Sequence, residues 1–267
     1  MNKYDDLPLW SAPFGLTLLD TVRMRSHINV LDIGSGSGFP MLELAGRMGS
    51  TCMVYGLDPS EESISMIAAK KEARGITFAK IIRGSAESIP FPDEYFGLIV
   101  SNNGINNAED QAAAMAECWR VADDGAQMVL TMNLPHTMVE FYEIFEKTLK
   151  DKGLYNEVIK MHEHIDMKRK PVEYLKDLIL DSGFMINTIN VDGFKMRFSD
   201  GTAFLNHYLV QTAFMEPWKS FLPAAHIDAV FLAIEEQLNA VAAENGEVVM
   251  SVPYVCFDCQ KRKQSKV

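Results

Sequence analysis

A glycine-rich turn between a buried strand and a helix constrains the fold of this chain more than any other feature. Residues 28–33 form a short, mainly apolar run, which is typical of a strand buried in a parallel sheet. Residues 40–48 show helical spacing of apolar side chains, and Gly49 ends that helix. The turn between them reads Gly34-Ser35-Gly36-Ser37-Gly38. Because glycine has no side chain, its backbone can approach a ligand closely.

The first half of the chain repeats this strand–helix alternation. Four further strands are predicted, at 52–57, 76–83, 96–101 and 127–132. A helix over 60–75 follows the second strand, and another begins at Asn107 and ends at residues 123–125. This rhythm predicts an α/β fold with a doubly wound, mostly parallel sheet. Ligands of such sheets bind beyond the carboxyl ends of the strands, beside the first strand.

The second half of the chain is less regular. Helices are predicted over 137–150 and 171–182, a sixth strand over 184–191, and a seventh over 248–257. A frayed basic tail is expected over 261–267. We therefore divide the chain into an N-terminal helical segment, a core, and a helical insertion before the last strand. Their bounds are 1–27 for the segment, 28–193 and 246–260 for the core, and 194–245 for the insertion.

Two of these segments have more than one interpretation. The N-terminal segment either closes over the ligand as a lid or pins a helix to the core through Trp10 and Phe14. The insertion either roofs a pocket for an apolar molecule, forms a homodimer interface, or packs a core of its own. Its aromatic residues suit all three roles: Phe198, Phe204, Tyr208, Phe214 and Trp218.

Composition excludes several classes of function. The chain has 267 residues, a formal charge of -11 and a pI near 5.0, which opposes binding to a phosphate backbone. The dense basic cluster at 168–170 is expected to be solvated. We expect no membrane span, because no apolar run reaches about 18 residues. The amino terminus has no secretory pattern, and four cysteines do not suggest a disulfide framework, so a cytoplasmic location is expected.

No metal site is predicted. His162 and His164 are two residues apart, and such residues do not face each other on a helix. Cys256 and Cys259 have no second pair to complete a tetrahedral site, and Cys52 is expected in the core.

Spacing and charge restrict the ligand of the glycine turn. A dinucleotide fingerprint needs a third glycine at position 39, where this chain has Phe39. Asp32 would repel a pyrophosphate but suits a ligand that carries an ammonium and a sulfonium. Asp58 ends the second strand, where a carboxylate can accept hydrogen bonds from ribose hydroxyls. Leu57 and Pro59 would give apolar walls to an adenine.

Three motifs carry a resemblance to a known family. Residues 30–38 resemble motif I of the class I S-adenosylmethionine-dependent methyltransferases, which have a Rossmann-like fold, and residues 55–60 look like their acidic ribose-binding motif. Residues 84–96 are similar to the segment after the third strand in the ubiquinone/menaquinone-biosynthesis type, methyltransferase domain 11. The motifs follow one another at the family's spacing and cover roughly residues 28–133.

The resemblance implies S-adenosylmethionine as cofactor and S-adenosylhomocysteine as product. The turn would cradle the methionine portion with Asp32 near its ammonium, Asp58 would hold the ribose, and Ser85 and Ala86 would flank the adenine. The implied cofactor-binding residues are Asp32, Gly34, Ser35, Gly36, Gly38, Asp58, Pro59, Ser85, Ala86, Asn102 and Asn103. The chain departs from the family twice, with Ser85 where Asp is usual and Gly97 where Asp usually follows the equivalent of Phe96.

These features predict an enzyme that transfers a methyl group to a small, partly apolar molecule. In-line displacement from a sulfonium needs a general base only when the acceptor arrives protonated. His136, just beyond the fifth strand, is the candidate base, with a turn residue as its other interpretation. Two alternatives stay open: a non-catalytic S-adenosylmethionine-binding protein, since no base is identified, and an NAD-dependent oxidoreductase, which Phe39 and Asp32 disfavour.

Overall fold

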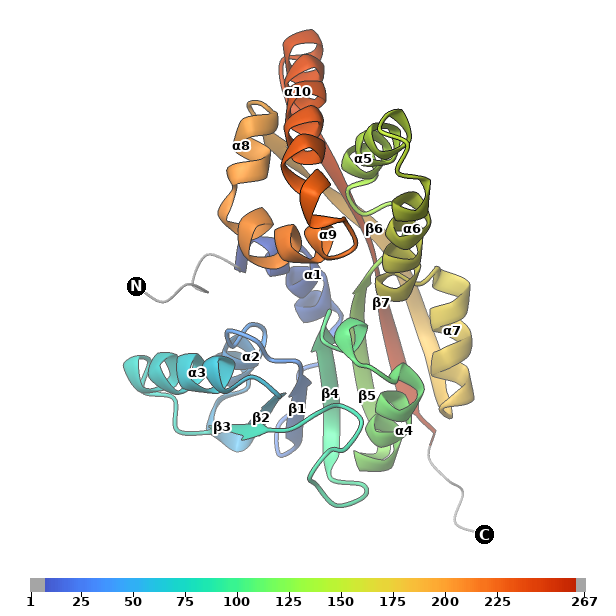
Figure 1. The fold of residues 1–267 in the computed structure, drawn as a ribbon. Helices are drawn as coiled ribbons and strands as arrows, with labels where there is room; N and C mark the ends of the chain where they lie inside the picture. The colour runs from blue at the N-terminus through green and yellow to red at the C-terminus, as the bar shows by residue number, and fades with distance from the viewer. Residues whose placement is uncertain (1–7, 263–267) are drawn as a thin grey trace. The chain divides into compact units, whose positions relative to one another are not determined.

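The chain forms a seven-stranded sheet with helices, described over residues 8–262 in a computed structural model (Figure 1). Residues 1–7 of the predicted N-terminal segment and 263–267 of the predicted tail lie outside that range. The strands are β1 Asn29–Ile33, β2 Met53–Asp58, β3 Ala79–Arg83, β4 Phe96–Asn102, β5 Ala122–Asn133, β6 Phe184–Phe198 and β7 Val248–Lys261.

The order of the strands is β3-β2-β1-β4-β5-β7-β6. The pairs β1–β2, β1–β4, β2–β3 and β4–β5 are parallel, and β5–β7 is antiparallel. The chain therefore reverses its direction of winding between β1 and β4, which opens a crevice beyond the carboxyl ends of these two strands. The predicted doubly wound, mostly parallel sheet with a helical insertion before the last strand is confirmed.

The helices follow the predicted rhythm with three differences. They are α1 Pro8–Thr21, α2 Met41–Met48, α3 Glu61–Ala73, α4 Gln111–Val121, α5 Val139–Asp151, α6 Tyr155–Lys168, α7 Val172–Asp181, α8 Gly201–Asn206, α9 Met215–Ser220 and α10 Ile227–Asn245. Helix α6 was not predicted. Asp110, rather than Asn107, caps α4 by accepting a hydrogen bond from the Ala113 N–H at 2.9 Å. Residues 123–125, predicted as the end of this helix, belong to β5, because α4 ends at Val121 and Ala122 already pairs with Phe96.

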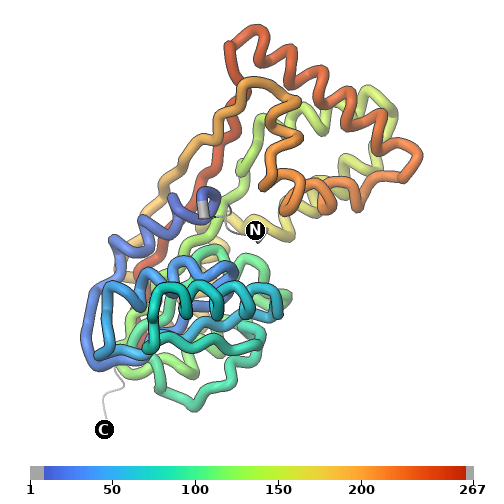
Figure 2. The backbone as a smooth tube through the Cα atoms, turned by 90° about the vertical axis from the view of Figure 1, so that its left-hand side faces the viewer, coloured from blue at the N-terminus to red at the C-terminus, as the bar shows by residue number. Residues whose placement is uncertain are grey.

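The chain divides into two compact units. The first contains Met1–Asn133, Pro171–Val191 and Tyr254–Val267, and the second contains Leu134–Lys170 and Asp192–Pro253. Strands β6 and β7 lie side by side and contribute residues to both units (Figure 2). The second unit thus combines the predicted insertion with the segment that holds α5 and α6.

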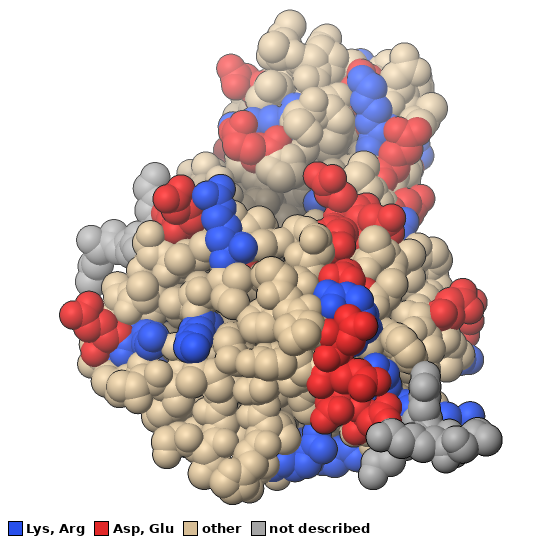
Figure 3. Space-filling view, turned by 90° about the horizontal axis from the view of Figure 1, so that it is seen from below, with Lys and Arg blue, Asp and Glu red and all other residues tan. Residues whose placement is uncertain are grey.

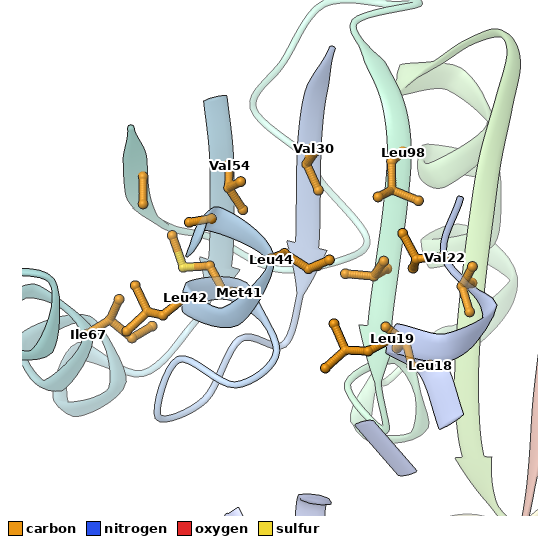
Figure 4. Close-up of a cluster of buried hydrophobic side chains, with 14 of the residues drawn as sticks. Leu18, Leu19, Val22, Val30, Met41, Leu42, Leu44, Val54, Ile67 and Leu98 are labelled. Atoms are coloured by element: carbon orange, nitrogen blue, oxygen red, sulfur yellow. The ribbon is translucent and has the colours of Figure 1, made fainter. Parts of the chain in front are cut away.

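The core of the first unit joins α1 and α2 to the strands (Figure 4). Leu18, Leu19 and Val22 of α1 belong to the same buried cluster as Leu44 of α2 and Val30 of β1. The strand before the glycine turn and the helix after it are stabilised because both contribute apolar side chains to this one cluster.

Helix α1 is also tied to β7. The ring of Phe14 is fully buried and lies 4.9 Å from the ring of Tyr254. The Tyr254 hydroxyl is 2.6 Å from the Thr17 hydroxyl. The interpretation that aromatic residues pin this helix to the core is therefore correct for Phe14.

Lys261, the first residue of the predicted frayed tail, is instead the last residue of β7. Lys261 is only 2% exposed, and its ammonium donates hydrogen bonds to the carbonyls of Trp119 and Ala122 at 3.0 and 2.8 Å. The same ammonium lies 4.1 Å from the centre of the Trp119 ring. A basic residue near a chain end can thus be buried when carbonyls and an aromatic face replace water.

The second unit has an aromatic core. The rings of Phe141 and Trp218 stack with centroids 4.0 Å apart, and Phe204 packs against both at 5.5 and 6.2 Å. Trp218 and Phe204 are fully buried. Core packing therefore accounts for these two of the five aromatic residues singled out in the insertion, while Phe198, Tyr208 and Phe214 are only partly buried.

Charge is unevenly distributed on the surface. Figure 3 shows Asp and Glu side chains gathered in a band across one face, with Lys and Arg side chains within and beside it. This agrees with the formal charge of -11. Among residues 8–262, no helix is both long enough and apolar enough to cross a membrane.

Replacing Leu44 by Ala tests the core of the first unit. Leu44 is fully buried in the cluster, so Leu44→Ala should lower the free energy of unfolding by about 2–5 kcal/mol through lost burial and a cavity. Urea denaturation followed by circular dichroism measures this change. Leu16, on the exposed side of α1 at 56% exposure, provides the control, and Leu16→Ala should cost less than about 1 kcal/mol. Equal losses in the two variants would contradict the packing described.

Candidate functional site

A pocket of about 770 Å³ lies beyond the carboxyl ends of the parallel strands in the first unit. Its wall comes from the segments that follow β1, β2, β3 and β4, together with the first turns of α1. It is lined by Trp10, Ser11, Ile33, Gly34, Gly36, Leu57, Asp58, Pro59, Gly84, Ser85, Ala86, Glu87, Asn102, Asn103, Gly104, Asn107, Ala108, Glu109 and Asp110. The position is the one expected for a ligand of a doubly wound sheet.

The glycine turn forms one side of the pocket and needs its glycines. Gly34 and Gly36 have φ of 71° and 50°, in the left-handed region that L side chains rarely adopt. A side chain on Gly34 would meet the Gly104 Cα at 2.5 Å, whereas a Cβ on Gly36 would meet no protein atom closer than 4.0 Å. Since Gly36 lines the pocket, its missing side chain leaves room for a ligand against the backbone.

Asp58, the last residue of β2, is hydrogen-bonded to the glycine turn and to the start of the next segment. One carboxylate oxygen accepts a hydrogen bond from the Gly36 N–H at 2.8 Å, and the other accepts one from the Ser60 N–H at 2.9 Å. The residue is 7% exposed. Each carboxylate oxygen has more than one acceptor position, so both oxygens can still accept from hydroxyl groups of a ligand.

Asp32 is buried rather than exposed in the pocket wall. One of its oxygens accepts a hydrogen bond from the Met41 N–H at 3.1 Å, and the other oxygen has no hydrogen-bond partner. Burial raises the pKa of Asp32 well above its usual value, the Met41 N–H opposes this rise, and the charge of Asp58 adds to it. A buried carboxylate with an unused oxygen is stabilised by a nearby positive charge.

Two other residues of the predicted set lie outside the pocket wall. Ser35 is buried with a hydroxyl that has no hydrogen-bond partner, and the Ser35 carbonyl accepts the Gly38 N–H at 2.8 Å. Gly38 has φ of 98° and is buried beside Leu42. Both residues are buried parts of the turn that do not line the pocket. Direct contact of either with a ligand stays a prediction.

Asn102 and Asn103 line the pocket at the end of β4. The Asn102 amide donates to the Ser11 carbonyl of α1 at 3.1 Å, and its oxygen accepts from the Thr131 hydroxyl at 2.8 Å. Asn103 has φ of 60°, and its side-chain oxygen accepts the Asn133 N–H at 2.9 Å. The ends of β4 and β5 are thus joined to the start of α1 at the rim of the pocket.

Ser85 is exposed at the pocket wall, next to Glu87. Burial would raise the pKa of Glu87, but backbone N–H groups, including those of Asp110 and Glu109, and the Ser85 hydroxyl lower it overall. Glu87 therefore carries its charge at the pocket. Together with Asp58, Glu109 and Asp110 it places four carboxylates in the described wall, in which no Lys or Arg takes part.

The second departure from the family pattern has a steric explanation. A side chain on Gly97 would meet Ile28 Cγ2 at 2.9 Å, and the Arg25 guanidinium donates a hydrogen bond to the Gly97 carbonyl. Gly97 therefore serves packing at the start of β4.

Gly104 is a pocket residue that the sequence analysis did not identify. A Cβ on Gly104 would lie 2.1 Å from the Ile33 carbonyl oxygen, so only glycine lets the two loops meet there. A glycine soon after a buried strand, as in the turn at Gly34, was the available signal. Glu87, Glu109 and Asp110 were also missed, because their position depends on contacts distant in sequence.

The other candidate residues lie elsewhere. His136 belongs to the second unit, in the exposed turn before α5, with φ of 70°. His162 and His164 are on α6, where His162 contacts Glu146 at 3.2 Å. All four cysteines are buried free thiols. Within the described residues, no three His, Cys, Asp or Glu side chains come together as metal ligands.

Part of the chain is similar to a known protein family. Residues 31–130 match the methyltransferase domain family. The chain is 30% identical over 124 residues to the demethylmenaquinone methyltransferase of Anoxybacillus flavithermus, a match that covers 46% of this chain and 52% of that protein. The chain thus spans about half the length of the curated relatives it matches.

Solved structures share the fold over nearly the whole chain. The YcgJ protein of Bacillus subtilis superposes with a TM-score of 0.62 at 16% identity, covering 95% of this chain and 99% of that one. A phosphoethanolamine N-methyltransferase 2 of Haemonchus contortus, bound to S-adenosylhomocysteine, has a TM-score of 0.56 at 16% identity over 93% of this chain and 52% of that one.

Replacing Asp32 by Asn tests the electrostatics behind the turn. Because its pKa in the folded protein lies above the usual value of 3.8, the folded state keeps the proton to higher pH than the unfolded state. The wild type should therefore lose stability as pH rises from 3.8 toward the raised pKa, and Asp32→Asn should lack that loss and be more stable at neutral pH. Urea midpoints across this range measure it, with the exposed Asp20→Asn as control. A less stable Asp32→Asn at neutral pH would contradict the assignment.

Proposed function

We propose that this protein transfers a methyl group from S-adenosylmethionine to a small, partly apolar molecule, because residues 31–130 match the methyltransferase domain family. The observation that carries the proposal is the charge of the pocket. Four carboxylates and no Lys or Arg among its described lining residues disfavour a pyrophosphate and favour a ligand that carries an ammonium and a sulfonium.

The residues of the pocket fit this cofactor. Gly34 and Gly36 would present backbone to its methionine portion, and the unused oxygen of Asp32 suits a positive charge beyond the turn. Asp58, fixed by two backbone N–H groups, would accept hydrogen bonds from the ribose. Leu57, Pro59 and Ala86 would give apolar contact to the adenine.

Ser85 cannot supply the carboxylate that the family usually has at this position. Glu87, which also lines the pocket and stays charged, is the carboxylate nearest in sequence that could accept from the adenine amino group. We propose that Glu87, two residues after Ser85, accepts the hydrogen bond from the adenine amino group in this protein. The proposal keeps Ser85 as a flanking residue of the adenine.

The start of α1 is proposed to act as a lid. Trp10 and Ser11 line the pocket, while Phe14, Leu18 and Leu19 anchor the following turns of the helix in the core. Pro13 lies inside the helix, where it has no N–H to donate to the preceding turn. The first turn can therefore move about Pro13 while the anchored part stays in place, and the Asn102–Ser11 hydrogen bond holds the closed arrangement.

The bound cofactor would supply an electrophilic methyl group on a positively charged sulfur. The chain's own contribution would be positioning and exclusion of water, which can account for most of the catalysis in such a displacement. His136 remains the candidate base for an acceptor that arrives protonated. Its exposed position on a strained turn supports that role without assigning it.

The acceptor is proposed to be a quinone-type aromatic molecule. The names of the relatives support this class, since one of them is a demethylmenaquinone methyltransferase. A cytoplasmic location is proposed on the four free thiols, which suit a reducing compartment. A homodimer and the role of the insertion as a cap over the acceptor remain predictions.

Two glycine variants separate cofactor binding from backbone strain. Gly36 and Gly75 both have positive φ, of 50° and 63°, and a Cβ on either meets no protein atom within less than 4.0 Å. Gly36→Ala should weaken S-adenosylhomocysteine binding by at least about tenfold, because its methyl group enters the pocket, and Gly75→Ala should leave it unchanged. Isothermal titration calorimetry measures both. Tight binding of NADH with no binding of S-adenosylhomocysteine would refute the proposed cofactor.

Turnover separates the enzyme from a non-catalytic binding protein. With S-adenosylmethionine and a panel of reduced naphthoquinones, the protein should release S-adenosylhomocysteine faster than in their absence. Mass spectrometry of the acceptor should show a gain of one methyl group. Absence of product across a broad panel of small acceptors, in a protein that binds the cofactor, would favour a sensor or scaffold.

A further inference from the structure

Asn103, the residue after β4, is fixed by hydrogen bonds to both its backbone and its side chain. Its N–H donates to the Thr131 carbonyl at 2.9 Å, and its carbonyl accepts from the Asn107 amide at 3.3 Å. Its side-chain oxygen accepts the Asn133 N–H at 2.9 Å and the Asn106 amide at 3.4 Å. These contacts leave one hydrogen-bonding group of Asn103 unused, the side-chain NH2.

The contacts also determine which way this amide is turned. A backbone N–H can only donate, so the side-chain atom of Asn103 that faces the Asn133 N–H must be the oxygen. The NH2 group then lies on the other side of the amide. Among residues 8–262 it forms no hydrogen bond, and it is not enclosed by protein atoms. Because Asn103 lines the pocket, this NH2 is a donor available to a pocket ligand.

The backbone of Asn103 is held in a costly conformation. Its φ of 60° lies in the left-handed region, which asparagine adopts more readily than most residues but still at a cost. A sharp turn at this point would need only the backbone of a glycine or an asparagine. It would not need the side-chain oxygen to be anchored by two donors. The anchored oxygen therefore indicates that the direction of the NH2 group matters.

Asn103 lies at the end of the pocket that the proposed cofactor arrangement leaves for the methyl acceptor. In that arrangement Glu87 after β3 would hold the adenine, Asp58 of β2 the ribose, and the turn after β1 the methionine portion. The strand order β3-β2-β1-β4 then puts β4 beyond the methionine end of the cofactor. The sulfonium lies between the ribose and the methionine portion, so its methyl group would be reached from this side.

The start of α1 borders the same side of the pocket. The Ser11 carbonyl accepts a hydrogen bond from the Asn102 amide at 3.1 Å, and Asn102 directly precedes Asn103. Trp10, next to Ser11, also lines the pocket. A polar donor and a large aromatic residue thus border one side, which suits a flat apolar molecule that carries an oxygen.

We propose that the Asn103 NH2 group donates a hydrogen bond to a ring oxygen of the methyl acceptor and so selects acceptors that carry one. The proposal rests on the proposed methyl transfer. A neutral amide suits this place, because a Lys or Arg donor would repel the sulfonium and a carboxylate would repel the oxygen. The class of acceptor is a flat molecule with a ketone, phenol or enolate oxygen, and a plain hydrocarbon ring is disfavoured.

Two ring probes that differ by one oxygen test this donor. 1-Indanone carries a ring ketone, and indane does not. Ligand-observed NMR gives both dissociation constants for the full chain, with and without saturating S-adenosylhomocysteine. In nitrogen-edited spectra, 1-indanone should shift the side-chain NH2 resonances of Asn103, and indane should leave them unchanged.

Replacing Asn103 by Asp assigns the preference to the NH2 group. Asn103→Asp keeps the size, the tolerance of a positive φ and the oxygen that accepts two hydrogen bonds, but replaces the donor by an acceptor. The affinity for 1-indanone relative to indane should fall by about 3- to 10-fold, as expected for one neutral hydrogen bond. Asn190→Asp makes the same charge change at an exposed position of β6 and should keep the wild-type ratio. Where Asn103→Asp does not fold, by near-ultraviolet circular dichroism, the resonance shifts of the wild type decide.

Equal affinity ratios in the wild type and Asn103→Asp overturn the proposal. So does a wild type that binds neither probe or shows no shift of the Asn103 resonances. A variant that keeps the ratio but loses S-adenosylhomocysteine binding also overturns it, since the amide would then hold the cofactor.

The cofactor titration tests the proposed function separately. If the wild type binds no S-adenosylhomocysteine but the ratio falls in Asn103→Asp, the proposed methyl transfer fails and the donor for a ligand oxygen stands. If the cofactor binds and the ratios are equal, the methyl transfer stands and the role of Asn103 fails.

Discussion

The pocket depends on a close approach between two loops that only glycine permits. The loop after β1 and the loop after β4 meet where Gly34 and Gly104 have no side chains, so their backbones touch. Ser101 reinforces the contact, because its hydroxyl donates to the Ile33 carbonyl at 2.9 Å and accepts the Ile105 N–H at 3.1 Å. At the point where the winding of the sheet reverses, this contact sets how far the loops can separate, and the remaining space beyond them is the pocket.

The parts of the fold that could be predicted were those with a periodic or glycine-spaced pattern within a short stretch of sequence. The apolar run before Gly34, the glycine spacing and the helical period of α2 lie within about 20 residues, so periodicity identified them. Errors arose where local composition and tertiary pairing disagreed. Residues 123–125 have the composition of a turn, but Ala122 pairs with Phe96 and draws them into β5. Helix α6 was missed, and its exposed apolar residues, such as Ile159 and Met167, blur its pattern.

The candidate site was predictable in part for the same reason. Gly34 and Gly36 follow β1, while Asp58 and Asn102 end β2 and β4, and parallel strands bring their carboxyl ends to one edge. What no local pattern records is which of these side chains faces the pocket. Asp32 and Ser35 belong to the same motif as Gly34 but are buried, whereas Ser11 reaches the pocket through a hydrogen bond to a residue 91 positions away. Such contacts depend on how whole elements pack, which one sequence does not show.

Two buried charges stand out because each lacks a full partner. Asp32 in the first unit has one oxygen without a hydrogen bond, and Arg169 in the second has an enclosed Nε without one. Burying a charge that is not neutralised lowers stability, and an apolar residue of similar volume would remove that cost. Arg169, which was expected from the sequence to be solvated, offsets part of this cost through the Thr137 carbonyl and the Tyr142 ring, whereas the unused oxygen of Asp32 lies behind the glycine turn with no such partner. A carboxylate behind a glycine turn suits a cationic cofactor, which would neutralise the Asp32 charge that folding alone leaves unpaired.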